Sequence, residues 1–162
     1  NAAYLADKQG LSVIDAVIGA LSKAGYDKPG SQKVYIQSTN SSVLLKFKEK
    51  TSYELVYKID ETVGDAANAA VEDIKRFASS VVVNKNSVIP NNEQFLTAYT
   101  NIVPTLKKAN LSVFVETFSN EFVSQAWDFF SDATVEINSY IEGEAQIDGI
   151  ITDFPKTADR YR

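Results

Sequence analysis

Short segments rich in β-branched and aromatic residues alternate with longer segments of helical period along the whole chain. The short segments have the length of strands and lie at residues 34–37, 54–59, 81–83, 111–117 and 147–152. This alternation predicts parallel strands joined by crossover helices. Parallel strands are covered on both faces, so runs such as residues 81–83 are apolar without strict alternation. A doubly wound open sheet and a partial (β/α)₈ TIM barrel of about five strands both fit this pattern.

Capping residues mark the ends of three predicted helices. We expect Gly25 to end a helix over residues 11–24, because glycine readily adopts the left-handed conformation that follows a helix. Asn40 is expected to cap the next helix, and Asp65 to open an alanine-rich helix that leads into residues 81–83. These boundaries place a helix between each pair of the first three strands.

Apolar spacing predicts further helices in the second half of the chain. One is expected over residues 95–106, with a kink or break caused by Pro104, and another over residues 134–141. A third is expected from about residue 120 and carries Phe122, Trp127 and Phe130. Trp127, Phe129 and Phe130 could form a platform for a carbohydrate or a partner, but a helix face packed on the sheet is the stronger interpretation.

The composition is that of one soluble globular domain over residues 1–162. A net charge of -5 excludes a general nucleic-acid binder, whose phosphate contacts need a basic face. No apolar run reaches the roughly 20 residues that a membrane-spanning helix needs. The chain has no Cys, Met or His, so it has no thiolate or imidazole for catalysis or zinc binding. The start at Asn1 indicates a processed or excised piece of something longer.

The C-terminal segment decides between the two architectures. Residues 147–155 read IDGIITDFP, which resembles the closing strand of glycerophosphodiester phosphodiesterases, where it completes a TIM barrel. Residues 156–162 resemble the plant cell-surface branch of that family. So do three segments further upstream, namely residues 34–40, 71–78 and 122–133. The resemblance covers nearly the whole chain and implies the C-terminal half of a barrel domain.

The resemblance also implies what the chain lacks. The family hydrolyses a glycerophosphodiester to an alcohol and glycerol 3-phosphate, with paired His residues as acid and base and with carboxylates that hold Ca²⁺ or Mg²⁺. Those groups belong to the first three strands, which precede Asn1. We therefore expect no cofactor in this chain and no activity from it alone. Five strands cannot close a barrel, so the expected partner is the missing N-terminal half or a second copy of the chain.

Polar residues at the ends of the predicted strands are the candidates for a substrate pocket, because TIM barrels bind ligands there. Lys58 could offer a cation to a phosphate, but a structural ion pair with a barrel carboxylate is the stronger interpretation. Glu116 or Asp153 could orient a hydroxyl, although Asp153 is more simply a turn or helix-capping residue. Gln37 and Asp60 complete the set.

Other features are better explained without a ligand. Residues 60–61 and 142–144 hold acidic pairs that we expect to be solvated, since the spacing of a Ca²⁺ loop is absent. Residues 116–119 read ETFS where many family members have a Trp-Thr-Val-Asn run, which puts their usual Trp contact to glycerol in doubt.

Two sequons, at Asn40 and Asn110, are candidate glycosylation sites and support an extracellular or plant cell-surface location. A non-catalytic binding or structural module of the cell surface or wall is the alternative function.

Overall fold

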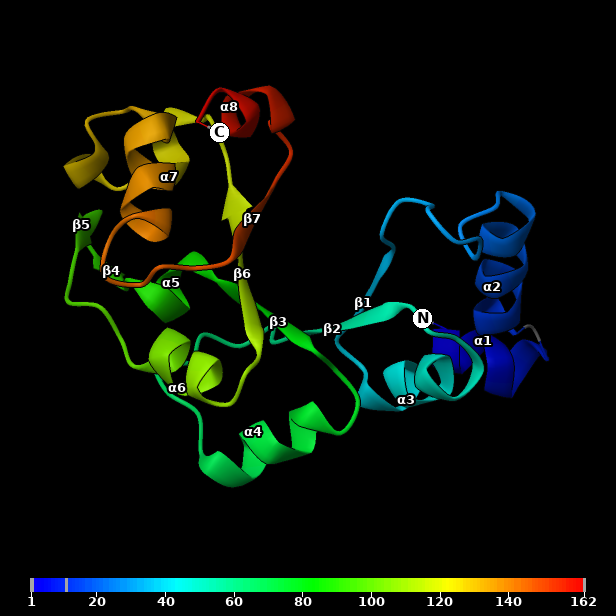
Figure 1. Ribbon diagram of the computed structural model, residues 1–162. Coiled ribbons are helices and arrows are strands. Elements are labelled where there is room, and N and C mark those ends of the chain that lie inside the picture. The colour runs from blue at the N-terminus through cyan, green and yellow to red at the C-terminus, as the bar shows by residue number, and fades with distance from the viewer. Residues whose placement is uncertain (1, 11, 162) are drawn as a thin grey trace.

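The computed structural model describes residues 2–10 and 12–161, and its centre is a five-stranded parallel sheet (Figure 1). The strands lie in the order β1 (Tyr35–Ser38), β2 (Glu54–Lys58), β3 (Ser80–Asn84), β6 (Ser112–Phe118) and β7 (Gly149–Thr152). Spatial order equals sequence order, so every crossover moves one strand further in the same direction. A doubly wound sheet reverses direction at its switch point. The fold is therefore a half-barrel, as the closing-strand motif predicted.

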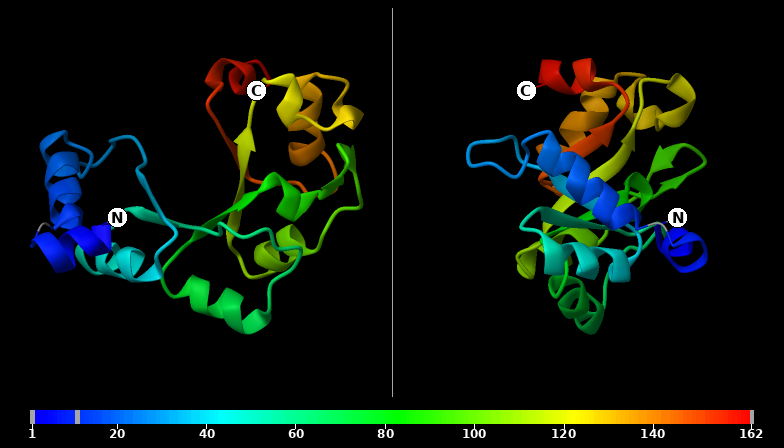
Figure 2. Two further views of the ribbon diagram at one scale, coloured as in Figure 1. Left: turned by 180° about the vertical axis from the view of Figure 1, so that it is seen from behind. Right: turned by 90° about the vertical axis from the view of Figure 1, so that its right-hand side faces the viewer.

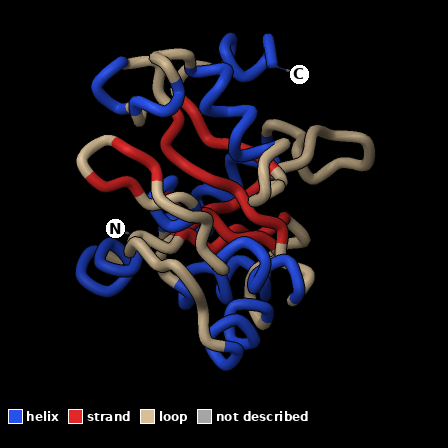
Figure 3. Tube along the Cα trace, turned by 90° about the vertical axis from the view of Figure 1, so that its left-hand side faces the viewer, coloured by secondary structure: helices blue, strands red, loops and turns tan. Residues whose placement is uncertain are grey.

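Helices lie along one side of this sheet, and in the described part of the chain no helix covers the other side (Figures 1 and 2). The main crossover helices are α2 (Val13–Lys23), α3 (Ser41–Lys50), α4 (Asn68–Lys75), α6 (Ile102–Lys108) and α7 (Ala133–Ile141). Shorter elements are α1 (Ala2–Gln9), α5 (Lys85–Val88), α8 (Pro155–Tyr161) and the 3₁₀ turns η1 (Phe122–Ser124) and η2 (Trp127–Phe129). A small hairpin of β4 (Asn91–Asn92) and β5 (Phe95–Leu96) stands apart from the main sheet (Figure 3).

Alternate residues of the strands point to opposite faces of the sheet. One set packs under the helices and forms the main core, which includes Val81, Val83, Val113 and Val115. The other set faces the open, concave side. Strand register places Lys58 beside Val82 and Val82 beside Phe114, so these three side chains share that face.

Gly149 is the point where the concave face has no room for a side chain. It lies opposite Phe114 in the pairing of β6 with β7. A Cβ atom added at Gly149 would lie 2.8 Å from Cδ1 of the Phe114 ring. The glycine of the IDGIITDFP segment therefore lets the last strand pass beneath that ring.

The capping predictions for the first two helices are confirmed. Asn40 Oδ1 accepts hydrogen bonds from the Ser42 and Val43 amides at the start of α3. Gly25 has a φ of 83° directly after the Ala24 cap of α2. The expected first residue of that helix, Leu11, lies outside the described residues.

The predicted start at Asp65 is wrong. Helix α4 begins three residues later, at Asn68, and its N-cap Ala67 makes no side-chain capping bond. Asp65 Oδ1 instead accepts from the Ala66 amide at 2.8 Å and from the Thr105 hydroxyl at 2.7 Å. Those hydrogen bonds lower the pKa of Asp65. The carboxylate joins this segment to α6 rather than capping its own helix.

The helix predicted over residues 95–106 is wrong in its first half. Phe95 and Leu96 form strand β5, and α6 begins only at Ile102. Pro104 then lies in the first turn of α6, where a missing amide hydrogen costs no hydrogen bond. The predicted kink is absent because α6 begins only two residues before the proline.

The aromatic helix predicted from residue 120 is also wrong. Two 3₁₀ turns, η1 and η2, occupy this segment. Among the aromatic side chains, that of Phe129 is buried, whereas those of Trp127 and Phe130 are largely exposed. The side chain of Phe122 lies outside the described part of the structure. The two rings that were expected to pack on the sheet therefore face solvent.

The half-barrel leaves both sheet edges open. In residues 2–10 and 12–161, β1 and β7 each pair with a single strand. Unpaired strand edges present free backbone donors and acceptors and favour association. None of the helices in the same residues has the length and apolar character needed to cross a lipid bilayer.

Candidate functional site

Two charged side chains meet on the concave face at the carboxyl end of the sheet. Lys58 is the last residue of β2, and Glu116 lies in β6, two strands away. The Lys58 Nζ atom is 2.7 Å from Glu116 Oε1 and 3.4 Å from Oδ1 of Asp60. The Lys58 side chain is 29% exposed and that of Glu116 is 15% exposed. The predicted ion pair between Lys58 and a barrel carboxylate is confirmed.

The ion pair fixes the charge of Lys58. The hydrogen bond to Glu116 raises the pKa of the Lys58 ammonium, against the opposing effect of partial burial. Lys58 is therefore a cation at neutral pH. Its position at the carboxyl end of parallel strands is where TIM barrels bind ligands.

The carboxylates of this site do not suit a divalent cation. Carboxylates that bind Ca²⁺ or Mg²⁺ must offer their charge to the metal. Here the Lys58 ammonium already neutralises Glu116 and contacts Asp60. Within the part of the chain that the structure describes, no three Asp or Glu side chains lie close enough together to hold a metal ion.

The structure does not bring the other two candidates into contact with this pair. Gln37 lies on the edge strand β1, beside Val56, and is exposed. Asp153 follows β7 and is also exposed, in the turn before α8. It borders a separate cavity of about 430 Å³ that Lys156 and Arg160 also line. The Phe154 amide donates to the Thr152 hydroxyl at 3.0 Å, so the side chain that accepts in this turn is that of Thr152.

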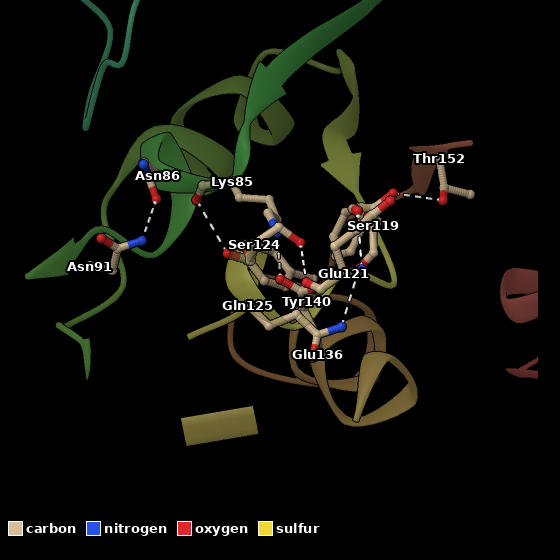
Figure 4. Close-up of polar contacts among 11 residues, drawn as sticks. Lys85, Asn86, Asn91, Ser119, Glu121, Ser124, Gln125, Glu136, Tyr140 and Thr152 are labelled. Carbon is tan, nitrogen blue, oxygen red and sulfur yellow. Dashed lines mark hydrogen bonds and ion pairs between the residues drawn. The ribbon is translucent and has the colours of Figure 1, made fainter. Parts of the chain in front are cut away.

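A second ion pair lies beneath the loops that follow β3 and β6, and sequence reasoning missed it (Figure 4). The Lys85 Nζ atom is 2.6 Å from Oε1 of Glu136 on α7, and the Glu136 side chain is only 2% exposed. Lys85 also donates to the Ser124 carbonyl at 3.3 Å, and the Tyr140 hydroxyl donates to the Lys85 carbonyl at 3.3 Å. The pair thus joins the end of β3 to the segment after β6.

Burial governs the electrostatics of this second pair. Desolvation raises the pKa of the Glu136 carboxyl, although the bond to Lys85 opposes the shift. Glu136 Oε2 and Gln125 Oε1 are buried without a hydrogen-bond partner in the described residues. One signal existed in the sequence, because Glu136 stands three residues after Ala133 and four before Tyr140 on the inner face of a helix.

The acidic pairs at residues 60–61 and 142–144 lie at the surface. Glu61, Glu142 and Glu144 are exposed, as expected for solvated charges. Only Asp60 of these residues contributes to the concave site, through its contact with Lys58.

Comparison with known proteins shows which family this chain matches. The profile of the glycerophosphoryl diester phosphodiesterase family matches residues 4–157, nearly the whole chain. The chain belongs to this family. It is 60% identical over its full length to glycerophosphodiester phosphodiesterase GDPDL1 and 55% identical to GDPDL3, both from Arabidopsis thaliana. It covers 21% of the length of each of these relatives.

A solved structure supports the half-barrel assignment. The chain superimposes on a glycerophosphodiester phosphodiesterase from Thermotoga maritima with a TM-score of 0.56 at 19% sequence identity. The match covers 93% of this chain and 54% of that one. At this level of identity the likeness shows the fold, which is about half of a TIM barrel.

Proposed function

We propose that this chain forms the C-terminal half of a glycerophosphodiester phosphodiesterase barrel, over residues 1–162, and contributes walls of the substrate pocket. The reaction of the completed barrel is hydrolysis of a glycerophosphodiester to an alcohol and glycerol 3-phosphate, a step of lipid metabolism. The observation that carries the proposal is the Lys58–Glu116 pair on the concave face, at the carboxyl end of the sheet. Membership of the family supports it.

Each candidate residue has a role in this reaction that its chemistry suits. The Lys58 ammonium is a fixed cation that can donate hydrogen bonds to phosphoryl oxygens. Glu116 keeps that ammonium in place, and its other carboxylate oxygen can accept from a glycerol hydroxyl. Gln37 and Asp153 lie at the two edges of the half-barrel, where they can contact the rest of the substrate once the barrel is closed.

The chemical step needs groups that this chain does not contain. Water attacks phosphorus, the phosphorus–oxygen bond to the alcohol breaks, and the alcohol takes up a proton. A histidine is the family's proton donor and acceptor, and the chain has no His. A Ca²⁺ or Mg²⁺ ion would offset negative charge on the phosphate. We assign both to an N-terminal half-barrel that pairs with the open edges of β1 and β7, with a second copy of the chain as the alternative partner.

Native mass spectrometry followed by an activity assay tests this proposal. The chain alone should release no glycerol 3-phosphate from glycerophosphocholine, with or without Ca²⁺ or Mg²⁺. Co-expression with an N-terminal half-barrel of the family should give a one-to-one particle with metal-dependent activity. A stable one-to-one particle without activity would contradict the proposal. Activity of the chain alone would also contradict it.

A non-catalytic module of the plant cell surface or wall is the second candidate. It is favoured by the exposed rings of Trp127 and Phe130, which the hydrolytic reaction does not use. An extracellular location accords with the sequons. Asn40 is exposed at the start of α3, and Asn110 is exposed at the end of α6 with a φ of 61°. Enzymatic removal of N-glycans from protein secreted by plant cells should lower its mass if these sites are used, and an unchanged mass would contradict glycosylation.

A further inference from the structure

Three aromatic side chains stand exposed on the loops at the carboxyl end of the sheet. Phe95 is 53% exposed, Trp127 is 62% exposed and Phe130 is 83% exposed. We call these three residues the aromatic rim. Phe95 belongs to the segment after β3, and the other two belong to the segment after β6. Single exposed apolar residues are ordinary, but a set of large rings on neighbouring loops is typical of an interaction site.

Hydrogen bonds hold the two loops together beneath the rings. The Trp127 amide donates to the Gln94 carbonyl at 2.9 Å, and the Leu96 amide donates to Asp128 Oδ2 at 2.8 Å. The rings of Phe95 and Trp127 are then in contact, with centroids 5.7 Å apart and planes inclined by 52°. The rings form a preorganised surface, which lowers the entropy cost of binding.

The backbone at Phe130 strengthens this interpretation. Phe130 has a φ of 53°, and Ser131 follows with a φ of 60°. Left-handed conformations are unfavourable for a bulky residue, and they persist where the surrounding structure enforces them, often at functional sites. Here the Phe130 amide donates to the Trp127 carbonyl at 3.0 Å. The chain thus keeps a large ring in solvent on a strained backbone.

Missing strands do not explain the exposure of the aromatic rim. Any added strand would pair with β1 or β7, because these are the two edges of the sheet. The loops that carry the rim follow β3 and β6, both of which already have neighbours on each side. Tyr35 is the contrasting case, because this exposed ring lies on the edge strand β1 and would be near an added strand.

The charges around the rim define the kind of ligand that it can take. No lysine or arginine lies among residues 86–106 or 109–155, and Lys85, which precedes them, is paired with Glu136. These loops therefore offer no unpaired lysine or arginine to a nucleic acid or an anionic lipid. Two nearby carboxylates already serve the backbone, since Asp128 accepts from the Leu96 amide and Asp132 accepts from the Thr134 amide. The exposed hairpin beside the rings carries the amides of Asn92 and Gln94 and the carboxylate of Glu93, while the Asn91 amide donates to Asn86 Oδ1 at 3.2 Å.

We propose that the aromatic rim binds a neutral carbohydrate. A pyranose with equatorial hydroxyls has an apolar C–H face that stacks on an aromatic ring, while its hydroxyls need polar donors and acceptors. Phe95 and Trp127 supply the rings, and the side chains of Asn92, Glu93 and Gln94 supply groups that can hydrogen-bond to hydroxyls. The proposal does not require the completed barrel to be a hydrolase.

The chain has a built-in probe for this test, because Trp127 is its single tryptophan. Titration of the full chain with cellohexaose should give a saturable change in tryptophan fluorescence. Phe95→Ala should weaken binding about tenfold through loss of a stacking ring. Trp127→Ala, followed by calorimetry, should remove binding, whereas the control Tyr35→Ala should leave it unchanged. Circular dichroism would verify that each variant is folded.

Three outcomes would overturn the inference. The first is no change in fluorescence or heat at any soluble concentration of cellohexaose. The second is a response to phosphatidylcholine vesicles instead, which would make the rim a membrane contact. The third is a response to tetramethylammonium chloride instead, which would make it a cation–π site. All three arms measure binding to the chain without its partner, so they are independent of any phosphodiesterase assay.

Discussion

The chain contains two lysine–glutamate pairs of nearly equal geometry in very different surroundings. Lys58 and Glu116 lie 2.7 Å apart on the open concave face, and Lys85 and Glu136 lie 2.6 Å apart beneath the loops at the same end of the sheet. The Lys58 side chain remains accessible, whereas Glu136 is almost completely buried. Distance does not distinguish the two pairs, but access to solvent does. The concave pair is therefore the better placed of the two to contact a ligand, whereas the buried carboxylate of Glu136 holds the loops in place through Lys85.

The largest predicted effect comes from breaking the buried pair. Glu136→Ala should lower the free energy of unfolding by about 3–5 kcal/mol, because it leaves the Lys85 ammonium without its charged partner. Urea denaturation measures this change.

A double variant serves as the control for the buried pair. Lys85→Met with Glu136→Leu removes both charges and should restore most of the lost stability, since apolar residues can replace a buried ion pair. A single variant with wild-type stability would mean that the pair is not buried as described.

A substitution at Gly149, on the concave face, should have the next largest effect on the free energy of unfolding. Gly149→Ala should cost about 1–3 kcal/mol, because the added Cβ would lie 2.8 Å from the Phe114 ring. Thermal unfolding measures the loss. Gly19→Ala is the matched control, because a Cβ there meets no atom within 4 Å. Equal effects at both positions would contradict the close approach of β7 to Phe114.

Breaking the concave pair should affect stability least of the three. Lys58→Met should lower the free energy of unfolding by about 1 kcal/mol, because the pair is partly solvated and Glu116 can regain water. Urea denaturation beside the Glu136→Ala variant gives the comparison. A loss as large as that of Glu136→Ala would show that the concave pair is structural.

The two pairs should change the stability of the chain in different pH ranges. Burial raises the pKa of Glu136 above its ordinary value of 4.5, so the folded chain binds this proton more tightly than the unfolded chain does. Wild-type stability should therefore rise relative to Glu136→Gln as the pH falls through the folded pKa towards 4.5.

Lys58 should respond only in alkaline solution. The hydrogen bond to Glu116 raises the pKa of Lys58 above 10.5, so its contribution is complete below that pH and is lost as the pH rises through the folded value. The stability difference between wild type and Lys58→Met, measured by urea denaturation at each pH, should shrink only there. A difference that shrank between pH 7 and pH 9 would contradict the assignment.

The parts of the fold that sequence patterns predicted are those with local signals. The five strands are apolar runs, and Asn40 and Gly25 mark helix ends through their own backbone chemistry. The β4–β5 hairpin and the turns η1 and η2 were missed because they depend on distant hydrogen bonds, such as that from the Trp127 amide to Gln94. No local pattern encodes such a contact, and the apolar spacing of residues 95–106 resembled a helix.

The residues of the two ion pairs also divide into those that a local sequence signal predicted and those that it did not. Lys58 was predicted because it ends a strand, where an ion pair or a ligand contact is expected. Lys85 and Glu136 were missed because 51 residues separate them, and only the packing of α7 brings them together. The order of the strands was likewise not evident from periodicity, and the closing-strand motif identified it.

The most direct test of the account is the activity of the assembled barrel with and without the concave pair. Glycerol 3-phosphate release from glycerophosphocholine would be measured for the one-to-one particle with an N-terminal half-barrel. Lys58→Met should lower kcat/KM about 100-fold through loss of a fixed donor to the phosphate. Lys46→Met, a change at an exposed residue of α3, should leave kcat/KM unchanged. Equal activity of the wild type and Lys58→Met particles would contradict a role for this pair in the substrate pocket.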